Sequence, residues 1–227
     1  MDLDRISIDV RGNSPEEEYR YLERTISSMP FYLEYGYTVG LPDLDELRSE
    51  QVVKDEKRMY PIFLEKEYNE SYFAEGIKKI KEKLSVIESC LPKLVEPNKR
   101  WGFKLFDTYL VLLTKYGPGG SYDPQTGKIT MLTQKDGTFK QEDPEQTVIH
   151  EIVHMGIEDC IVETFKLSHA EKERLVDLLV KKTFSDVFPN YKIQSMGETK
   201  IDPYITNESI NNLPPDIEKY VSSYPRQ

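Results

Sequence analysis

The spacing of hydrophobic residues predicts that the first part of the chain is mainly helical. Three alternating apolar residues open it as a short strand or arm: Ile6, Ile8 and Val10. Ser14 can accept a hydrogen bond from a helical N–H, and Pro15 suits the first position of a helix. We expect this helix to end near Ser28, before Met29 and Pro30.

A second helical pattern covers residues 70–90. Apolar residues recur there at spacings of three and four, which places them on one face of an α-helix: Phe73, Ile77, Ile80, Leu84 and Ile87. Because proline removes a backbone N–H and clashes with the preceding turn, we expect Pro92 and Pro97 to end this helix. Residues 1–100 are therefore predicted to form a mainly helical region, whose role the sequence leaves open.

From residue 101 the pattern changes to strands followed by helices. Residues 104–116 contain a β-branched and aromatic run that is typical of a buried strand. A Gly-Pro-Gly-Gly break at 117–120 follows, and residues 121–133 resemble a hairpin. Asp143 and Ser168 then supply the start signals of two helices. This order of elements predicts an α+β protein.

The chain is thereby divided into three parts. The helical region covers residues 1–100, and the α+β core covers residues 101–189. In residues 190–227 the periodicity is lost and Asn, Pro and Ser are frequent, so we expect an irregular C-terminal tail. Such a tail could lie in a cleft of the core and hold the protein latent.

Charge and composition exclude several classes of function. The 30 Lys and Arg residues against 40 Asp and Glu give a formal net charge of −10, whereas nucleic-acid binding needs clustered basic residues. The longest apolar run, Tyr109–Leu113, is far shorter than the roughly 20 residues of a membrane helix. The sequence begins without a secretory signal, and Cys90 and Cys160 are too few for a disulfide framework. We therefore expect a cytoplasmic protein with no nucleic-acid or membrane partner; its oligomeric state stays open.

The most informative motif is HExxH at residues 150–154. His150 and His154 lie roughly 40° apart around a helix and about 6 Å apart along its axis. Two imidazoles so placed can converge on one Zn²⁺. Glu151 lies on the adjacent edge, where it can reach a water beside the metal without competing for the metal. We therefore expect one zinc ion per chain, bound by both histidines.

A catalytic zinc needs a third protein ligand and one open position. The helix after Ser168 offers Glu173, which lies beside a second apolar face with Asp177 one turn further on. Buried carboxylates are costly unless they bind something. A metal on Glu173 and a histidine ring N–H on Asp177 would satisfy both groups. The alternatives for the third ligand are His169, Glu163 and Cys160. If Cys160 bound in addition to Glu173, a set of two histidines, Glu and Cys would close the site.

The two motifs together resemble a known family. HExxH at 150–154, followed on the next helix by ExxxD at 173–177, is similar to the gluzincin group of zinc metallopeptidases, the thermolysin-like type. The resemblance covers roughly residues 104–182. It implies a zincin-like core with a small mixed sheet, an edge strand above the HExxH helix and a second ligand-bearing helix. It also implies individual roles: His150, His154 and Glu173 as ligands, Glu151 as general base, and Asp177 as partner of a ligand histidine.

Two further expectations follow from this resemblance. Zincins bind the substrate peptide as an added strand along the edge strand, and the expected edge residues are Ile129, Thr130 and Met131. The chain has no histidine after His169, so the downstream histidine with which thermolysin stabilises its oxyanion is missing. The residues considered for stabilising the transition state are His169, Tyr204, Tyr191 and Tyr122.

The sequence thus predicts a zinc-dependent peptidase that acts on a peptide or protein substrate, with Glu151 as the general base. Two alternatives stay open. A non-catalytic module could use zinc as a structural brace with four protein ligands. A metal-free interaction protein could instead act through its tyrosine-rich N-terminal half.

Overall fold

A mixed β-sheet forms the centre of the computed structural model, which describes residues 6–140, 142–195 and 197–224. The strands of the described residues are β1 (Ser7–Gly12), β2 (Thr108–Thr114), β3 (Gly120–Asp123) and β4 (Lys128–Leu132). Their order across the sheet is β1-β2-β4-β3. Both β1 and β4 run parallel to β2, whereas β3 runs antiparallel to β4. The coarse α+β class expected from the sequence is therefore confirmed.

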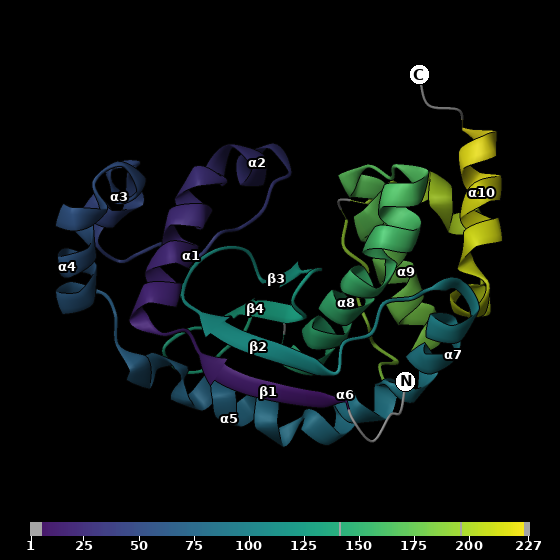
Figure 1. Cartoon of the computed structure of the whole chain (residues 1–227), viewed down its shortest axis with the longest axis horizontal. Coiled ribbons are helices and arrows are strands. Elements are labelled where there is room, and N and C mark those ends of the chain that lie inside the picture. Colours follow the sequence, from purple (N-terminus) through teal and green to yellow (C-terminus); the bar gives the residue numbers. More distant parts are fainter. Residues whose placement is uncertain (1–5, 141, 196, 225–227) are drawn as a thin grey trace.

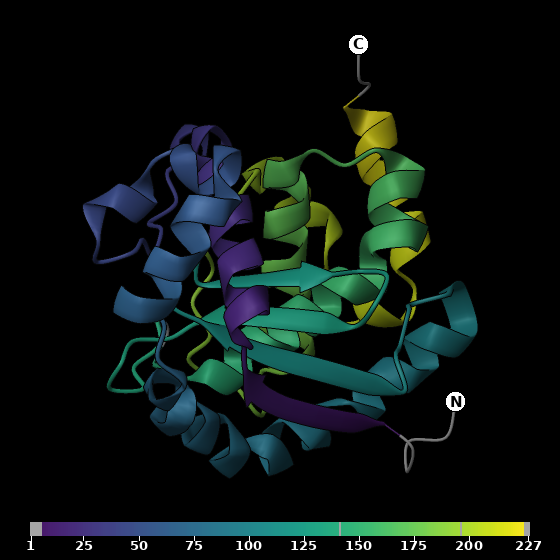
Figure 2. The same cartoon turned by 60° about the vertical axis from the view of Figure 1, so that its left-hand side comes forward.

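Helices surround this sheet (Figures 1 and 2). The α-helices are α1 (Pro15–Ser27), α2 (Met29–Glu34), α3 (Gln51–Lys54), α4 (Glu56–Lys66), α5 (Ala74–Glu82), α6 (Leu84–Cys90), α7 (Pro92–Trp101), α8 (Pro144–Ile157), α9 (His169–Thr183) and α10 (Leu213–Ser223). Shorter helical turns are η2 (Asp45–Arg48), η3 (Glu70–Phe73), the π-helical η4 (Glu158–Glu163), η5 (Thr199–Tyr204) and η6 (Ser209–Asn211). Figure 1 shows α5 and α6 running along the β1 side of the sheet, while α8 and α9 lie at the β3 and β4 side.

The larger hydrophobic core lies between one face of the sheet and the helices α5, α6 and α8. Successive side chains of a strand point to opposite faces, so one row of paired residues can be fully apolar. Val111 of β2 pairs with Val10 on one side and Ile129 on the other, and Leu113 pairs with Met131. This core also contains residues from both ends of the chain, from Ile8 to Tyr220. The N-terminal and C-terminal segments therefore contribute buried side chains to the core.

A second, smaller core belongs to the N-terminal helices. Side chains from α1, η2, α3 and α4 pack there around Tyr116, which follows β2: Tyr19, Leu22, Ile26, Leu47, Val52, Met59 and Phe63. Ser14 caps the start of α1 as expected, and it does so in a capping box, with Ser14 and Glu17 each bonding the other's backbone N–H. The same motif, with Ser168 and Glu171, begins α9.

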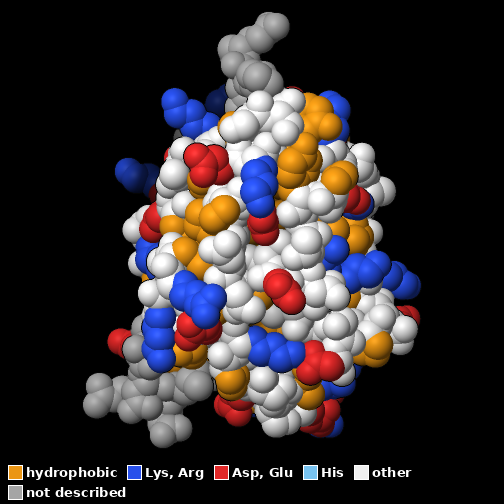
Figure 3. All heavy atoms as spheres, turned by 90° about the vertical axis from the view of Figure 1, so that its right-hand side faces the viewer, with side chains coloured by type: hydrophobic (Ala, Val, Ile, Leu, Met, Phe, Trp, Pro, Cys, Tyr) orange, Lys and Arg blue, Asp and Glu red, His pale blue; other side chains and the backbone are white. Residues whose placement is uncertain are grey.

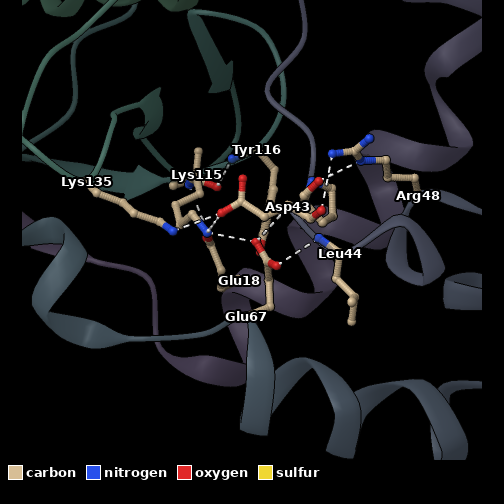
Figure 4. Close-up of polar contacts among 10 residues, drawn as sticks. Glu18, Asp43, Leu44, Arg48, Glu67, Lys115, Tyr116 and Lys135 are labelled. Atoms are coloured by element: carbon tan, nitrogen blue, oxygen red, sulfur yellow. Dashed lines mark hydrogen bonds and ion pairs between the residues drawn. The ribbon is translucent and has the colours of Figure 1, made fainter.

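A buried polar network joins this N-terminal part to the end of β2 (Figure 4). Glu67, at the end of α4, accepts hydrogen bonds from Lys115 Nζ at 2.8 Å and from the Tyr116 hydroxyl at 3.3 Å. Glu18 of α1 accepts bonds from the Lys115 backbone N–H at 2.8 Å and from Asn13 Nδ2 at 2.7 Å. Because Tyr116 leads directly into the loop before β3, this network holds the position from which β3 begins.

Three local expectations need correction. A helix does end before Pro92, at Cys90, but Pro92 then begins α7, since proline fits the first position, and Pro97 lies inside α7 instead of ending a helix. The pattern over residues 70–90 forms two helices that meet at Lys83. Asp143 precedes α8 but does not cap it, because its carboxylate accepts a bond from the Gln146 side chain.

The expected edge strand is also corrected by the sheet order. Ile129, Thr130 and Met131 belong to β4, which is paired on both sides, with β2 and with β3. The hairpin folds back so that its first strand, β3, takes the edge position next to β4 among the described residues, while β1 lies at the other edge. The edge on the side of α8 is therefore offered by Gly120–Asp123.

The C-terminal segment is more regular than its composition suggested. It contains η5, η6 and α10, which pack through buried apolar side chains against the larger core: Ile201, Ile205, Ile210, Leu213, Ile217 and Tyr220. Arg174 of α9 forms an ion pair with Asp202 that fastens η5 to α9. At this end of the molecule charged and hydrophobic side chains are interspersed on the surface (Figure 3). Apolar packing therefore anchors the described part of the segment, which argues against a loose inhibitory tail.

Every helix in the described residues falls short of the length and apolar character that crossing a bilayer requires.

Glu18 makes stability depend on pH. Its side chain is 1% exposed, and burial raises its pKa to about 7, against the lowering effect of its bonds to Lys115, Asn13 and Thr114. The folded state thus keeps a proton that the unfolded chain loses near its usual pKa of 4.5. This group should therefore cost about 1–3 kcal/mol of stability as the pH rises from 5 to 8.

We expect Glu18→Gln to remove that loss, because an amide does not ionise. Urea unfolding at pH 5 and pH 8 measures it, with Glu56→Gln on the exposed start of α4 as the control. An unchanged pH dependence in Glu18→Gln would contradict the assignment.

Candidate metal centre

The HExxH motif lies on α8, and almost every residue of this helix is buried. His150 and His154 stand one turn apart, and α9 packs beside them and brings Glu173 to the same point. The Nε2 atoms of the two histidines are 3.0 Å apart. Glu173 Oε2 lies 3.4 Å from His154 Nε2 and 3.8 Å from His150 Nε2. These three residues form a buried group that can hold a metal ion.

The size of this triangle fits a small tetrahedral ion. Four ligands at roughly 2.0–2.1 Å from a metal lie about 3.3–3.4 Å from one another. The three observed separations scatter around that value. Imidazole nitrogens favour transition metals, whereas Ca²⁺ and Mg²⁺ prefer an all-oxygen environment.

The electrostatics of the site also favour a bound cation. Three carboxylates are at most 7% exposed and surround the two imidazoles: Glu151, Glu173 and Asp177. Burial lowers the pKa of His150, but Glu173, Glu151 and Asp177 outweigh it and raise the pKa to about 9. Burial lowers the pKa of His154 to about 4, and both histidines hold the pKa of Glu173 well below its usual range despite burial. The carboxylates therefore stabilise positive charge next to His150, while burial keeps His154 neutral, the form in which an imidazole binds a metal.

Asp177 acts on His150 through the hydroxyl of Tyr191. The sequence did not predict this role of Tyr191. The Tyr191 hydroxyl donates to Asp177 Oδ1 at 2.8 Å and lies 2.7 Å from His150 Nδ1. The direct separation of His150 Nδ1 and Asp177 Oδ1 is longer, at 3.4 Å. Since the hydroxyl proton goes to Asp177, its oxygen accepts from His150 Nδ1–H. This arrangement leaves the lone pair of Nε2 facing Glu173 and His154, as a metal ligand requires.

Glu151 lies beside the triangle, against the edge strand β3. Burial raises the pKa of this carboxyl to about 7, with a further contribution from Glu173, while His150 and Lys172 lower it. A side chain at Gly120 would place its Cβ 2.3 Å from Glu151 Oε1. Glycine at this position therefore allows the carboxylate to lie directly against the backbone of β3.

A cleft of about 410 Å³ opens onto this site, within the size range of small-molecule and peptide sites. Its floor includes His150, Glu151, His154 and Glu173, and one wall is the loop and strand from Pro118 to Tyr122. The other walls come from α1, the α2 segment, α9 and the segment after it: Arg24, Phe31, Tyr32, Tyr37, His169, Lys172, Tyr191 and Gln194.

The alternatives for the third ligand do not belong to the three-residue group. Cys160 and Glu163 belong to η4, where Cys160 Sγ contacts the Gly156 carbonyl and the Glu163 side chain is exposed. His169 begins α9 and lines the cleft, with its Nδ1 3.7 Å from Glu173 Oε1. Its Nε2 instead shares a hydrogen bond of 2.8 Å with the Tyr37 hydroxyl.

The tyrosines considered for stabilising the transition state differ in whether they line the cleft. Tyr204 was wrongly placed near the site: η5 directs its ring against Tyr220 and Tyr224, and the ring does not line the cleft. Tyr122 does line the cleft, and its ring stacks on His154 with centroids 4.9 Å apart. Its hydroxyl donates to Glu158 and accepts a bond from Lys172 at 2.9 Å.

Tyr37 is a cleft residue that sequence reasoning missed. It lies more than a hundred residues before the motif helices, and only the aromatic character of its segment marked it.

Comparisons of the chain with known families, with curated proteins and with solved structures gave no match. The geometry of the site is therefore what indicates the function of this chain.

We expect Tyr191→Phe to weaken metal binding about 10–100-fold, the usual effect of losing a partner that orients a ligand histidine. His154→Ala should abolish binding at this site, since it removes a ligand. Competition titration of Co²⁺ against a chromophoric chelator measures both effects. Tyr204→Phe is the matched control, and equal affinities for Tyr191→Phe and this control would contradict the role given to Tyr191.

Proposed function

We propose that this protein is a zinc-dependent peptidase. The observation that carries the proposal is the buried triangle of His150, His154 and Glu173 at the floor of a cleft, with Glu151 beside it. Two histidines, one carboxylate and an open fourth position are the ligand set of many catalytic zinc sites. A structural brace would need a fourth protein ligand, and the cluster found among the described residues has three.

The chemistry divides between the metal and the protein. When bound, zinc supplies Lewis-acid polarisation of a water and of the scissile carbonyl. Glu151 takes the proton of the attacking water and delivers it to the leaving amine nitrogen. Its burial and raised pKa suit a group that must both accept and release a proton near neutral pH.

The cleft walls suit an extended peptide. We assign the substrate-binding edge to β3, because Gly120, Ser121 and Tyr122 of this strand line the cleft and Gly120 lies next to Glu151. A peptide added along this edge forms backbone hydrogen bonds as a further strand. His169 and Tyr37, bonded to each other at the opposite wall, are the groups that we assign to stabilising charge on the carbonyl oxygen.

The direct test is Glu151→Gln, which removes the base but keeps its shape. We expect hydrolysis of a quenched fluorescent peptide library to fall about 10²–10⁴-fold while one zinc per chain is retained. The matched control is Glu163→Gln, on an exposed position of η4, which should keep both activity and metal. Full activity in Glu151→Gln would overturn the proposal.

Gly120→Ala tests the position of Glu151. Its Cβ would displace the carboxylate, and an error of this size in a catalytic group costs roughly 10²-fold in rate. The melting temperature should change little, because the atom nearest to the new methyl group ends a flexible side chain. Unchanged kcat/KM in a folded Gly120→Ala chain would show that Glu151 does not need this backbone approach.

A further inference from the structure

The helix α2 carries apolar side chains that the fold does not bury. Five of its six residues, Met-Pro-Phe-Tyr-Leu-Glu, are apolar or aromatic, and none of them is buried. Phe31 is 40% exposed and Leu33 is 70% exposed. Clustered apolar side chains left open to solvent mark binding surfaces more often than single exposed residues do.

Three aromatic residues of this segment face the catalytic cleft: Phe31, Tyr32 and Tyr37, which we name the aromatic rim. The rings support one another, with centroids 5.8 Å apart for Phe31 and Tyr32 and 5.9 Å apart for Tyr32 and Tyr37. The Phe31 ring also meets the edge of His169 at 5.2 Å. The rim is therefore a pre-formed wall that reaches from the N-terminal helices to α9.

The chemistry of this wall differs from that of the cleft floor. The floor carries the carboxylates of Glu151, Glu158 and Glu173, whereas the rim offers ring faces and edges. The rim and β3 line the same cleft, so a peptide strand on β3 lies within one continuous pocket with the rim. Figure 1 shows α2 above β3, on the same side of the sheet as the upper end of α1.

We propose that the aromatic rim is the specificity subsite for one large apolar side chain of the bound peptide, with aromatic side chains preferred. The inference rests on the proposed peptidase function, because the strand on β3 is the substrate. An aromatic side chain gains edge-to-face or offset contacts with Phe31 and Tyr32 and leaves water. A substrate lacking that group forfeits binding by at least about tenfold, as is usual for apolar pockets.

A membrane surface is the less favoured partner. The rim rings line the cleft, while Leu33, the more exposed of the two apolar side chains quantified above, is not among the lining residues. An interfacial anchor would need the rings directed away from the protein. Leu33 therefore provides a control on the same helix.

The test measures binding in the absence of cleavage. The zinc-loaded Glu151→Gln chain is titrated calorimetrically with a neutral ten-residue Gly/Ser/Thr peptide carrying one central Phe, Leu, Ala or Asp. The otherwise uniform peptide can slide along β3 until its variable residue meets the rim. The same titrations are repeated after adding Phe31→Ala, Tyr32→Ala or Leu33→Ala, each checked for folding by circular dichroism.

We expect the Phe peptide to bind at least about tenfold more tightly than the Ala peptide. Phe31→Ala and Tyr32→Ala should each reduce this ratio to about twofold, and Leu33→Ala should preserve it. Equal affinities of the Phe and Ala peptides would overturn the proposal, as would an equal loss of preference in Leu33→Ala. The proposal would also be overturned if the chain bound phosphatidylcholine vesicles without any peptide and Phe31→Ala abolished this binding. The partner of the rim would then be a membrane surface.

The outcome for the rim is separable from the outcome for catalysis. If the wild-type chain cleaves none of the peptides but the Phe preference is present in the Glu151→Gln chain, the peptidase proposal fails and the rim stands. If the wild type cleaves the peptides without any preference, the rim fails and the peptidase proposal stands.

Discussion

The site depends on the electrostatic interaction of two buried imidazoles with the carboxylate of Glu173. Lone pairs and negative charge that face one another in a buried place are unfavourable unless a cation lies between them. The helices α8 and α9 are held together by apolar packing, which supplies the free energy needed to bring His150, His154 and Glu173 within 4 Å. The Tyr191–Asp177 pair then orients His150 so that its Nε2 lone pair faces the centre.

The N-terminal helices give this centre its cleft. The polar network around Glu67 and Lys115 joins α1 and α4 to the end of β2, and the chain then runs directly into β3. A hydrogen bond of 2.8 Å between the Tyr21 hydroxyl of α1 and the Ser121 hydroxyl of β3 also connects this region to the edge strand. The region whose role the sequence left open therefore positions the edge strand and supplies one wall of the cleft.

The sequence predicted what depends on short spacings. The four-residue spacing of His150 and His154 places both on one face of any helix, and the caps at Ser14 and Ser168 act within a single turn. It could not predict the edge strand, because the position of β4 is set by its parallel pairing with β2 across the sheet. Tyr191 and Tyr37 reach the site from irregular segments, where no periodicity indicates the direction of a side chain.

The most direct test of the central claim is anomalous X-ray diffraction at the zinc edge from crystals of the zinc-loaded chain. We predict one strong peak, within roughly 2.0–2.2 Å of His150 Nε2, His154 Nε2 and a Glu173 oxygen. Its fourth position should face Glu151 and hold a water. The absence of a peak between α8 and α9, or a fourth protein ligand such as Cys160 or His169, would contradict a catalytic metal centre.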